Sequence, residues 1–564
     1  GSRAGGLAYV LGWTGGFCLL GLLFARQINA SRAITIPQML GDLFDSLWLR
    51  RWAALGTITC SAIYLVAQIY GIGLVASMLS GLTFELGVFM ALGGILLCSF
   101  LGGMHAVTWT QLVQCLVLVV TMLAIAIAVA WKTHGQPIVP WAAAQAMGQV
   151  NERARQIEAD PLEQSTREMM RIRLEDLNRK IADPLSARQL ERELLMRQIS
   201  LLKSENAPLR EIHRLESSPV LRDGDIQKLV QAWQRERDDI QKALRRPIGF
   251  EGLAQPGAYP QLSNTLALVF CLILGTAGLP HILSRSFTTA TPGQAQRSVA
   301  WAMLFIVLVY ITASALAVLL KESVLTELVG ARLDALPDWA DKLKLRKLGL
   351  LSLHDWNGDG RVQWGDIHLG NDLLMLAAPD IAHVSPVFTG LIAAGALAAA
   401  LSTADGLLLT ISNSLAHDVY PPSRIDSANP LRRVMLSKVL LMLVALVAAL
   451  VATYRPVDIL FWVACAFSLA ASTFFPVMVL GLHWPRMSRT GALLSMLSGM
   501  GMATYYIFTN HPWVQARLGL DPALTGWWGL EAYSAAVFGV PIGLLAGCLG
   551  SLAWPRGQTV AKAL

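Results

Sequence analysis

The chain has few charged residues, and nearly half of them are confined to one segment. Asp, Glu, Lys and Arg make up 15% of its 564 residues. Residues 151–250 hold 20 Lys/Arg and 18 Asp/Glu, which leaves 45 of the 83 charged residues for the rest of the chain. Hydrophobic residues account for 54%, and the mean hydropathy is +0.50. This distribution excludes an ordinary soluble protein and predicts a polytopic membrane protein with one soluble insertion.

The sequence also lacks the signatures of several other classes. Its net charge of +7 comes without a basic stripe interleaved with aromatic residues, so nucleic-acid binding is not expected. All seven cysteines lie in apolar runs, which predicts small packing residues and no disulfide framework. No nucleophile, base and orienting group occur in a recognisable motif, so we do not expect an enzyme.

Long apolar runs dominate the sequence. Each is about 19 residues or longer, which is the length typical of a transmembrane helix. Eleven are expected, near residues 7–25, 53–80, 83–101, 106–131, 262–284, 299–320, 385–416, 434–453, 457–483, 490–509 and 532–554.

The basic residues of the short loops predict the orientation. One side has only Arg455 and Arg517. The other side collects Arg26, Arg32, Arg50, Arg51, Arg285, Arg297, Arg424, Arg432, Arg433, Arg486, Arg489, Arg556 and Lys562. The positive-inside rule places this second side, with the C-terminus, in the cytoplasm, and an odd number of spans places the start of the chain outside. Since no signal peptide or earlier span delivers that start, we expect upstream helices to be missing.

Two long segments, 132–261 and 321–384, are therefore expected on the outer face. The first alternates Leu, Ile and Met with charged residues at helical spacing, and prolines at 184, 208 and 219 interrupt it. A helical hairpin or bundle fits this pattern better than one long rod. A solvated accessory domain, docking of a small membrane-protein partner and capping of the outer entrance all remain open as its role.

The second outer segment contains a sequence that matches a calcium loop of the EF-hand type. Oxygen side chains stand at loop positions 1, 3 and 5, a glycine at 6 and a carboxylate at 12. Because position 12 is Asp and not Glu, weak Ca²⁺ or preferential Mg²⁺ binding is expected, and an unoccupied turn of similar sequence is the alternative. The predicted ligands are Asp355, Asn357, Asp359, Arg361, Gln363 and Asp366.

Polar groups inside the apolar run 384–415 point to an ion site. Ser402 and Thr403 are the smallest carriers of oxygen ligands there, and Ala399 and its small neighbours allow a second helix to come close. We interpret this segment as half of a sodium site. Asp405 is the nearest carboxylate and could tune the ion affinity, carry a proton or pin two helices.

A helix break is expected at 274–280, where two glycines precede Pro280. Transporters use such breaks to expose backbone groups to ions and solutes, although a simple kink remains possible. His281 and Arg285 follow one turn apart, as an interfacial anchor or a substrate clamp.

Five motifs together resemble the sodium:solute symporter family, and most closely its acetate-permease-like branch with a large extracytoplasmic insertion. They are Gly12-Trp-Thr-Gly-Gly16, Thr35-Ile-Pro-Gln-Met-Leu40, Gly102-Gly-Met-His-Ala-Val-Thr-Trp-Thr-Gln111, Gly275-Thr-Ala-Gly-Leu-Pro-His281 and Leu401-Ser-Thr-Ala-Asp405. The resemblance implies an all-α leucine-transporter fold of two inverted five-helix repeats, here without the first core helix. It also implies a multi-pass protein of the bacterial inner membrane.

The resemblance further implies functional residues. The family's sodium site maps to the carbonyl of Ala399 and the hydroxyls of Ser402 and Thr403. Gln111 stands where sugar and proline transporters of the family carry Asp, so their substrates are not carried over. A short monocarboxylate such as acetate is the implied solute. The residues expected to contact it are Gln68, Tyr70, Gly275, Thr276, Ala277 and Gly278, and those expected to assist coupling are Asp405 and Gln111.

The chain is expected to be organised in five parts. The parts are 1–131 (incomplete first repeat), 132–261 (insertion), 262–320 (start of the second repeat), 321–384 (outer loop) and 385–564 (remaining helices). The alternative to sodium-coupled symport is that the protein has lost transport and serves as a solute-sensing or partner-recruiting membrane protein.

Overall fold

The computed structural model describes most of the chain and divides it into two units. The described residues are 4–204, 215–216, 226–250, 262–345, 351–369, 377–419, 430–454, 459–511, 514–515, 518 and 526–555. The membrane unit comprises Gly1–Gln145, Leu253–Leu320 and Asp372–Leu564, and the insertion unit comprises Ala146–Gly252 and Lys321–Asn371. Outside the described residues lie Pro208, Pro219, Arg424, Arg455, Arg517, Arg556 and Lys562, so the predictions made from them have no structural counterpart here.

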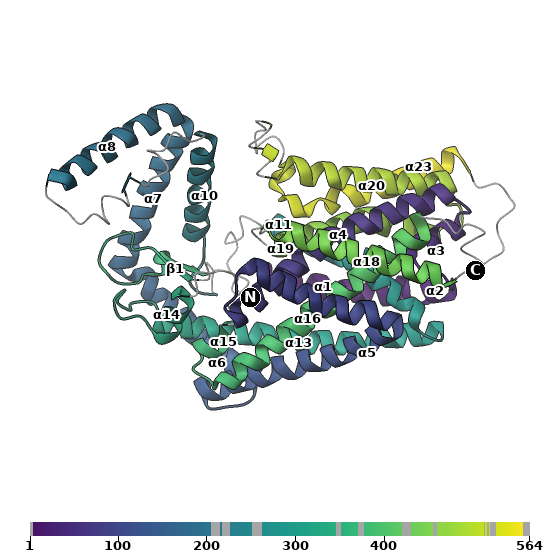
Figure 1. Ribbon diagram of the computed structural model, residues 1–564, viewed down its shortest axis with the longest axis horizontal. Helices are drawn as coiled ribbons and strands as arrows, with labels where there is room; N and C mark the ends of the chain where they lie inside the picture. Colours follow the sequence, from purple (N-terminus) through teal and green to yellow (C-terminus); the bar gives the residue numbers. More distant parts are fainter. Residues whose placement is uncertain are drawn as a thin grey trace. The chain divides into compact units, whose positions relative to one another are not determined.

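The membrane unit is built from helices, several of which run side by side in Figure 1. Its long helices are α1 (Ala4–Leu23), α4 (Leu47–Ser80), α5 (Phe84–His134), α11 (Leu262–Gly278), α13 (Pro292–Glu327, which continues into the insertion unit), α16 (Pro386–Ser414), α18 (Pro430–Ala452), α19 (Ile459–His483), α20 (Arg489–Thr509) and α23 (Ala536–Ala553). Its short elements are α2 (Ala25–Ala30), α3 (Ile36–Leu43), α12 (Pro280–Leu283), η2 (Ser284–Thr288), α15 (Ala378–Ile381), η4 (Leu415–Val419), η5 (Trp527–Gly529) and η6 (Ala532–Ser534). The predicted all-α architecture is confirmed.

Local sequence explains where several helices begin and end. The Ser46 hydroxyl accepts a hydrogen bond from the backbone N–H of Leu49 and so caps the start of α4, and Ser488 caps α20 through Gly491 in the same way. The helix α4 ends at Gly81, whose φ of +70° lies in the left-handed region that glycine adopts without strain.

Nine of the eleven predicted spans correspond to helices that can cross a membrane. Among the described residues, eight helices are long and apolar enough, and the bent pair formed by α11 and α12–η2 makes a ninth. The span predicted at 7–25 is a shorter apolar helix, and the spans predicted at 83–101 and 106–131 run together in α5. No proline stands between them, so every backbone donor of the helix is retained. The count of eleven spans stays a prediction.

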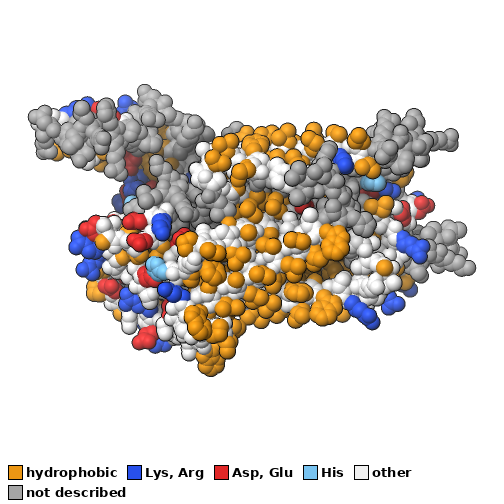
Figure 2. Space-filling model, turned by 60° about the horizontal axis from the view of Figure 1, so that its bottom comes forward, with side chains coloured by type: hydrophobic (Ala, Val, Ile, Leu, Met, Phe, Trp, Pro, Cys, Tyr) orange, Lys and Arg blue, Asp and Glu red, His pale blue; other side chains and the backbone are white. Residues whose placement is uncertain are grey.

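The core of the membrane unit lies around α19. Phe467, Phe474 and Met478 of α19 are buried against Leu272 of α11 and Phe24, which follows α1. The outer surface is instead apolar: a broad area of hydrophobic side chains is exposed in Figure 2, and in α18 alone Leu443 and Val447 are 58% and 52% exposed. Apolar exposure on this scale fits a lipid-facing surface and not an aqueous one.

The insertion unit combines segments from both predicted outer regions. Its helices are α6 (Val139–Ala159, which begins in the membrane unit), α7 (Pro161–Ala182), α8 (Pro184–Ser204), α10 (Ile226–Leu244) and α14 (Asp338–Leu345), joined by η3 (Trp364–Asp366) and the antiparallel strands β1 (Leu351–Leu353) and β2 (Ile367–Leu369). The break predicted at Pro184 is present between α7 and α8. The sequence did not indicate the strand pair.

A small apolar core holds α7 and α10 side by side (Figure 1). Met170 and Leu177 of α7 are buried with Trp233 and Ile240 of α10. Arg173 of α7 also donates a 2.8 Å hydrogen bond to Glu236 of α10, but both side chains are more than a third exposed. Burial of the apolar side chains therefore stabilises this pair more than the ion pair does.

Candidate functional site

The predicted sodium ligands lie on one face of α16. Ala399, Ser402 and Thr403 are spaced three and four residues apart, which places them on the same side of a helix. All three are half-buried, whereas Ala404 and Asp405 beside them are fully buried. The polar face of α16 is thus distinct from the face that packs into the protein.

Two of the predicted ligand oxygens are adjacent. The hydroxyl of Thr403 donates to the carbonyl oxygen of Ala399 at 3.2 Å. A hydroxyl in this position has lone pairs left for a cation, and a helix carbonyl can accept a second interaction. The structure therefore brings the oxygens of Ala399 and Thr403 together. Three oxygens from one helix supply only part of the shell of a hard cation.

Gln111 connects this segment of α16 to α5. Its side-chain amide donates to the carbonyl oxygen of Ser402 at 3.1 Å. A carboxylate in place of this amide would accept hydrogen bonds only and would repel the same carbonyl. The Gln at this position is therefore compatible with direct contact between α5 and the predicted ion site.

A cavity opens next to this segment, on the side toward the end of α16. Its lining comes from residues 34–37 at the start of α3, from α4, from α12–η2 and from α16. Of the described lining residues, Arg285 alone carries a charge. The lining residues are Ile34, Thr35, Ile36, Pro37, Thr57, Pro280, Ser284, Arg285, Thr288, Gly406, Leu409, Thr410, Asn413 and Ser414.

Arg285 lies against α16 immediately beside Asp405. Its guanidinium nitrogen Nη2 is 2.8 Å from the position that a Cβ at residue 406 would occupy, so Gly406 makes room for it. Asp405, which is 1% exposed, attracts Arg285 electrostatically. The side chain of Arg285 is thus directed into the protein, although the sequence alone left an interfacial anchor and a substrate clamp both open.

The helix break predicted at 274–280 is present. The helix α11 ends at Gly278, Leu279 is extended, and α12 begins at Pro280 with a bend of 46° between the two parts. Proline at the first helical position removes a donor that would have no partner there. His281 follows the break and is buried, with its ring 5.6 Å from that of Tyr64 in α4.

The four residues before the break are occupied by helix packing. Thr276 and Ala277 are fully buried, and the hydroxyl of Thr276 donates to the carbonyl of Leu272 at 2.7 Å. A Cβ at Gly275 would lie 2.5 Å from the carbonyl oxygen of Phe467 in α19, which requires a residue without a side chain at this crossing. A role of Gly275, Thr276, Ala277 and Gly278 in solute binding stays a prediction.

The other two predicted solute contacts, Gln68 and Tyr70, lie in the second half of α4. Both are half-buried. The ring of Tyr70 packs against Phe84 at the start of α5, with 5.3 Å between the ring centroids. Their predicted contact with solute also stays a prediction.

A polar cluster that the sequence analysis missed joins α3 and α4 to the end of α16. Asp418 in η4 is 3% exposed and accepts hydrogen bonds from the Thr35 hydroxyl at 2.9 Å and from Arg50 Nε at 2.8 Å. Arg50 also donates to the carbonyl of His417 at 3.0 Å. In the sequence Arg50 counted only as a loop cation. Nothing in the sequence near Arg50 identifies a partner 368 positions away.

In the insertion unit, the loop 355–366 is closed by its own hydrogen bonds. Asp355 accepts from the backbone N–H groups of Gly358 and Gly360, at 2.8 and 3.0 Å. Asp359 accepts from the side-chain amide of Gln363 at 2.7 Å. Both glycines have φ of +72°, as the sharp turn requires. The fold of the loop therefore already uses carboxylate oxygens that were predicted to bind a cation.

The carboxylate predicted at position 12 points inward. Asp366 is 3% exposed and accepts from the backbone N–H groups of Gln363 at 2.8 Å and Trp356 at 3.3 Å. Burial raises the pKa of Asp366 to about 7, against the opposing effect of these two donors.

The predicted divalent-cation site is accordingly not supported. Within the part of the chain that the structure describes, no group of three or more His, Cys, Asp or Glu is arranged to hold a metal ion. The ligand roles proposed for Asp355, Asn357, Asp359, Arg361, Gln363 and Asp366 therefore stay predictions without structural support.

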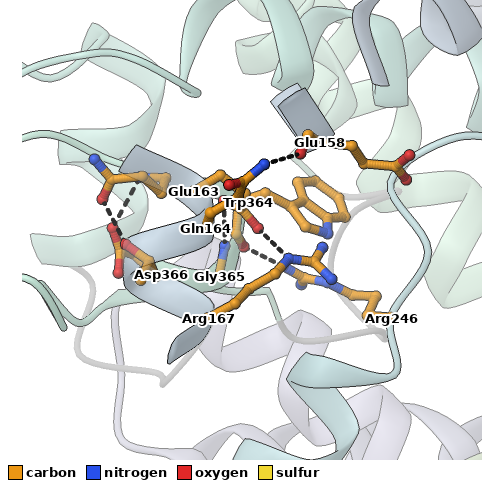
Figure 3. Close-up of polar contacts among 10 residues, drawn as sticks. Glu158, Glu163, Gln164, Arg167, Arg246, Trp364, Gly365 and Asp366 are labelled. Atoms are coloured by element: carbon orange, nitrogen blue, oxygen red, sulfur yellow. Dashed lines mark hydrogen bonds and ion pairs between the residues drawn. The ribbon is translucent and has the colours of Figure 1, made fainter. Parts of the chain in front are cut away.

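Neighbouring helices hold this loop in place, as Figure 3 shows. Glu163 at the start of α7 is 1% exposed and accepts from Arg167 at 2.8 Å and from the backbone N–H of Gly365 at 3.2 Å. Arg246, just after α10, lies 4.0 Å from the ring centroid of Trp364 and donates to its carbonyl at 2.7 Å. These contacts indicate a structural role for the loop.

The sequence model of the Sodium:solute symporter family matches residues 2–174 and 376–499. The chain belongs to this family. The match confirms the family resemblance and includes four of the five motifs, and it supports sodium-coupled symport of a solute across a membrane as the activity of this symporter.

Individual relatives support the assignment. An uncharacterized symporter of Cupriavidus necator is 41% identical to this symporter over 574 residues, which cover 99% of the chain and 83% of the relative. A monocarboxylic acid transporter of Corynebacterium glutamicum is 26% identical over 304 residues, covering 51% of the chain and 46% of the relative.

A solved structure confirms the leucine-transporter fold. A Na⁺-coupled sialic acid symporter, in its substrate-bound outward-open state, superposes with a TM-score of 0.56 at 12% identity. The similarity covers 97% of this chain and 84% of that one. The family match and the apolar spans together identify a multi-pass membrane protein.

Proposed function

We propose that the protein couples sodium entry to the uptake of a short monocarboxylate by alternating access. The observation that carries the ion part is the pair of adjacent oxygens on α16, the Ala399 carbonyl and the Thr403 hydroxyl, next to the half-buried Ser402. Small hydroxyl and carbonyl oxygens are the ligands that a hard monovalent cation prefers over nitrogen or sulfur. Ala399, Ser402 and Thr403 are therefore the proposed sodium ligands.

The proposed coupling uses the difference between two arrangements of the helices. Sodium held by α16 and a second helix stabilises the arrangement in which the two are close, and separation of the helices weakens the site. At about 100 mV, the membrane potential contributes about 2.3 kcal/mol for each charge moved, which supports accumulation of a solute by several tens of times.

The proposed solute class has two supports. One relative is named a monocarboxylic acid transporter, although the match covers about half of each chain. The second is the cavity beside the proposed ion site, whose lining contains a single charged residue, the cation Arg285, among the described residues. A small anion with one negative charge is complementary to such a cavity.

The test is uptake of labelled acetate, propionate, lactate and pyruvate into proteoliposomes that contain the full-length protein. We expect accumulation of at least one acid when an inward sodium gradient is imposed, and none when potassium replaces sodium. The Ser402→Ala/Thr403→Ala double variant should lose this uptake, whereas Thr389→Ala on the same helix should keep it.

Sodium-independent uptake that survives the double change would contradict the proposed coupling. Sodium-dependent binding of an acid without any flux would instead favour the rival function, a sensor or partner-recruiting protein that no longer transports. Uptake of none of the four acids would reject the solute class.

A further inference from the structure

The cavity beside α16 offers hydrogen-bond donors from three different elements. Arg285 comes from η2, Thr57 from α4 and Asn413 from the last turn of α16. Several other hydroxyls of the lining already donate elsewhere: Thr410 to the carbonyl of Gly406 at 2.8 Å, Ser284 to that of His281 at 3.0 Å and Thr35 to Asp418 at 2.9 Å. Arg285, Thr57 and Asn413 thus offer a guanidinium, a hydroxyl and an amide that can donate to a bound molecule.

Thr57 provides an independent sign of a ligand. Its side chain is 0% exposed, and its hydroxyl oxygen has no hydrogen-bond partner among the described residues. A buried hydroxyl without a partner destabilises the folded protein, and native proteins rarely leave one unsatisfied. Because Thr57 lines the cavity, a molecule held there can supply the missing partner.

The position of Arg285 is prepared by the residues behind it. Gly406 leaves the space in which the guanidinium lies, since a Cβ at that position would be 2.8 Å from Nη2. Asp405 is buried next to Gly406 and attracts the guanidinium, which keeps the long side chain from extending away from α16. A planar guanidinium fixed in this way presents two parallel N–H groups, which match the two oxygens of a carboxylate.

We infer that this cavity is a binding site for the carboxylate group of a small anion, with Arg285 as the charge-recognising residue and Thr57 and Asn413 as neutral donors. The inference rests on the proposed function for its substrate class: the anion is the transported monocarboxylate on its way through the protein. It adds to that function a site for the solute and a residue that selects acids over neutral molecules of the same shape.

Direct binding tests the inference separately from transport. The probes are sodium acetate and the neutral isostere acetamide, added at constant sodium concentration to the purified full-length protein, with binding followed by saturation-transfer NMR and by the thermal unfolding midpoint. We expect the wild type to bind acetate in preference to acetamide. Arg285→Gln should weaken acetate binding by about tenfold or more, because a bidentate, charge-assisted contact is lost, and should leave acetamide unchanged.

Three further variants guard against a merely structural effect. Arg285→Lys keeps the positive charge but lacks the two parallel N–H groups of the guanidinium. Its acetate affinity should lie between those of the wild type and Arg285→Gln. Thr57→Val removes the unpartnered hydroxyl at nearly constant volume and should weaken acetate binding several-fold. Arg297→Gln makes the same change of charge at an exposed position in α13 and should bind acetate as the wild type does.

The outcomes separate the two proposals. Acetate binding that Arg285→Gln reduces, in a protein that shows no uptake, would support the site and reject the proposed transport. Acetate binding by the wild type that is equal in Arg285→Gln would overturn the site even if uptake is observed. Equal loss of acetate and acetamide binding in Arg285→Gln would indicate a structural role, and absence of acetate binding to the wild type would also overturn the inference.

Discussion

At the scale of single residues, the same residue type serves two purposes that only its neighbours distinguish. Gly275 lies in a glycine-rich stretch that predicted an opened helix, yet its lack of a side chain allows close contact with the backbone of Phe467. Gly501 in α20 has nothing within 4 Å of the position of an added Cβ. The two glycines therefore differ in what a substitution would do, although both stand in helices.

This difference gives a paired prediction. Gly275→Ala should lower the stability of the protein by about 1–3 kcal/mol, because α11 must move away from α19 to accommodate the added methyl group. Gly501→Ala should be neutral or stabilising by about 0.5–1 kcal/mol, since alanine loses less conformational freedom in a helix. The thermal unfolding midpoints of the two purified variants check this, and equal midpoints would contradict the packing described around Gly275.

At the scale of elements, local signals in the sequence predicted local structure well. Pro280 and the preceding glycine located the break between α11 and α12, and Pro184 located the junction of α7 and α8. The positions of Ala399, Ser402 and Thr403 on one face of α16 follow from helical spacing alone. Each of these features depends on residues a few positions apart, so no tertiary information was needed.

Features that depend on distant residues were not predictable. The hydrogen bond from Arg50 to Asp418 joins residues 368 positions apart, and the insertion unit assembles two chain segments separated by membrane helices. The loop 355–366 shows the same limit, because its sequence matches a calcium loop while its carboxylates are engaged by donors that only the folded backbone brings close.

The contact between Arg50 and Asp418 should be a strong connection between the start of α4 and the end of α16. Asp418 has no side-chain exposure and Arg50 has 20%, so either Arg50→Gln or Asp418→Asn should cost up to about 3 kcal/mol by leaving a partner unsatisfied. The double variant should lose less unfolding free energy than the two single variants lose together, and the difference, which is the interaction energy of the pair, should be about 0.5–3 kcal/mol. Strictly additive changes in unfolding free energy would show that the pair contributes no coupling.

The loop 355–366 gives a prediction about metal removal. Because Asp355 and Asp359 already accept hydrogen bonds from Gly358, Gly360 and Gln363, the stability of the insertion unit should not depend on a divalent cation. Thermal unfolding in EDTA and in millimolar calcium should therefore give the same midpoint. A calcium-dependent increase that Asp355→Asn abolishes would restore the cation site that the sequence predicted.

At the scale of the whole molecule, the membrane unit carries the family fold and the proposed transport site, while the insertion unit has its own core. The proposed sodium ligands, the cavity and Arg285 all belong to the membrane unit. The carboxylates of the loop 355–366 belong to the insertion unit, where they stabilise local structure. The function is therefore expected to depend on α16 and on helices that pack against it, among them α4, α5, α18 and α12.

The sodium-activation curve of solute uptake tests the central claim most directly. Uptake of the best of the four acids is measured at increasing sodium concentration, with the membrane potential held constant, for the wild type, Thr403→Ala and Thr389→Ala. Loss of one ligand oxygen should raise the half-saturating sodium concentration about tenfold for Thr403→Ala, corresponding to about 1.4 kcal/mol of lost binding, and leave it unchanged for Thr389→Ala. An unchanged sodium dependence in Thr403→Ala would contradict the assignment of this hydroxyl as a sodium ligand.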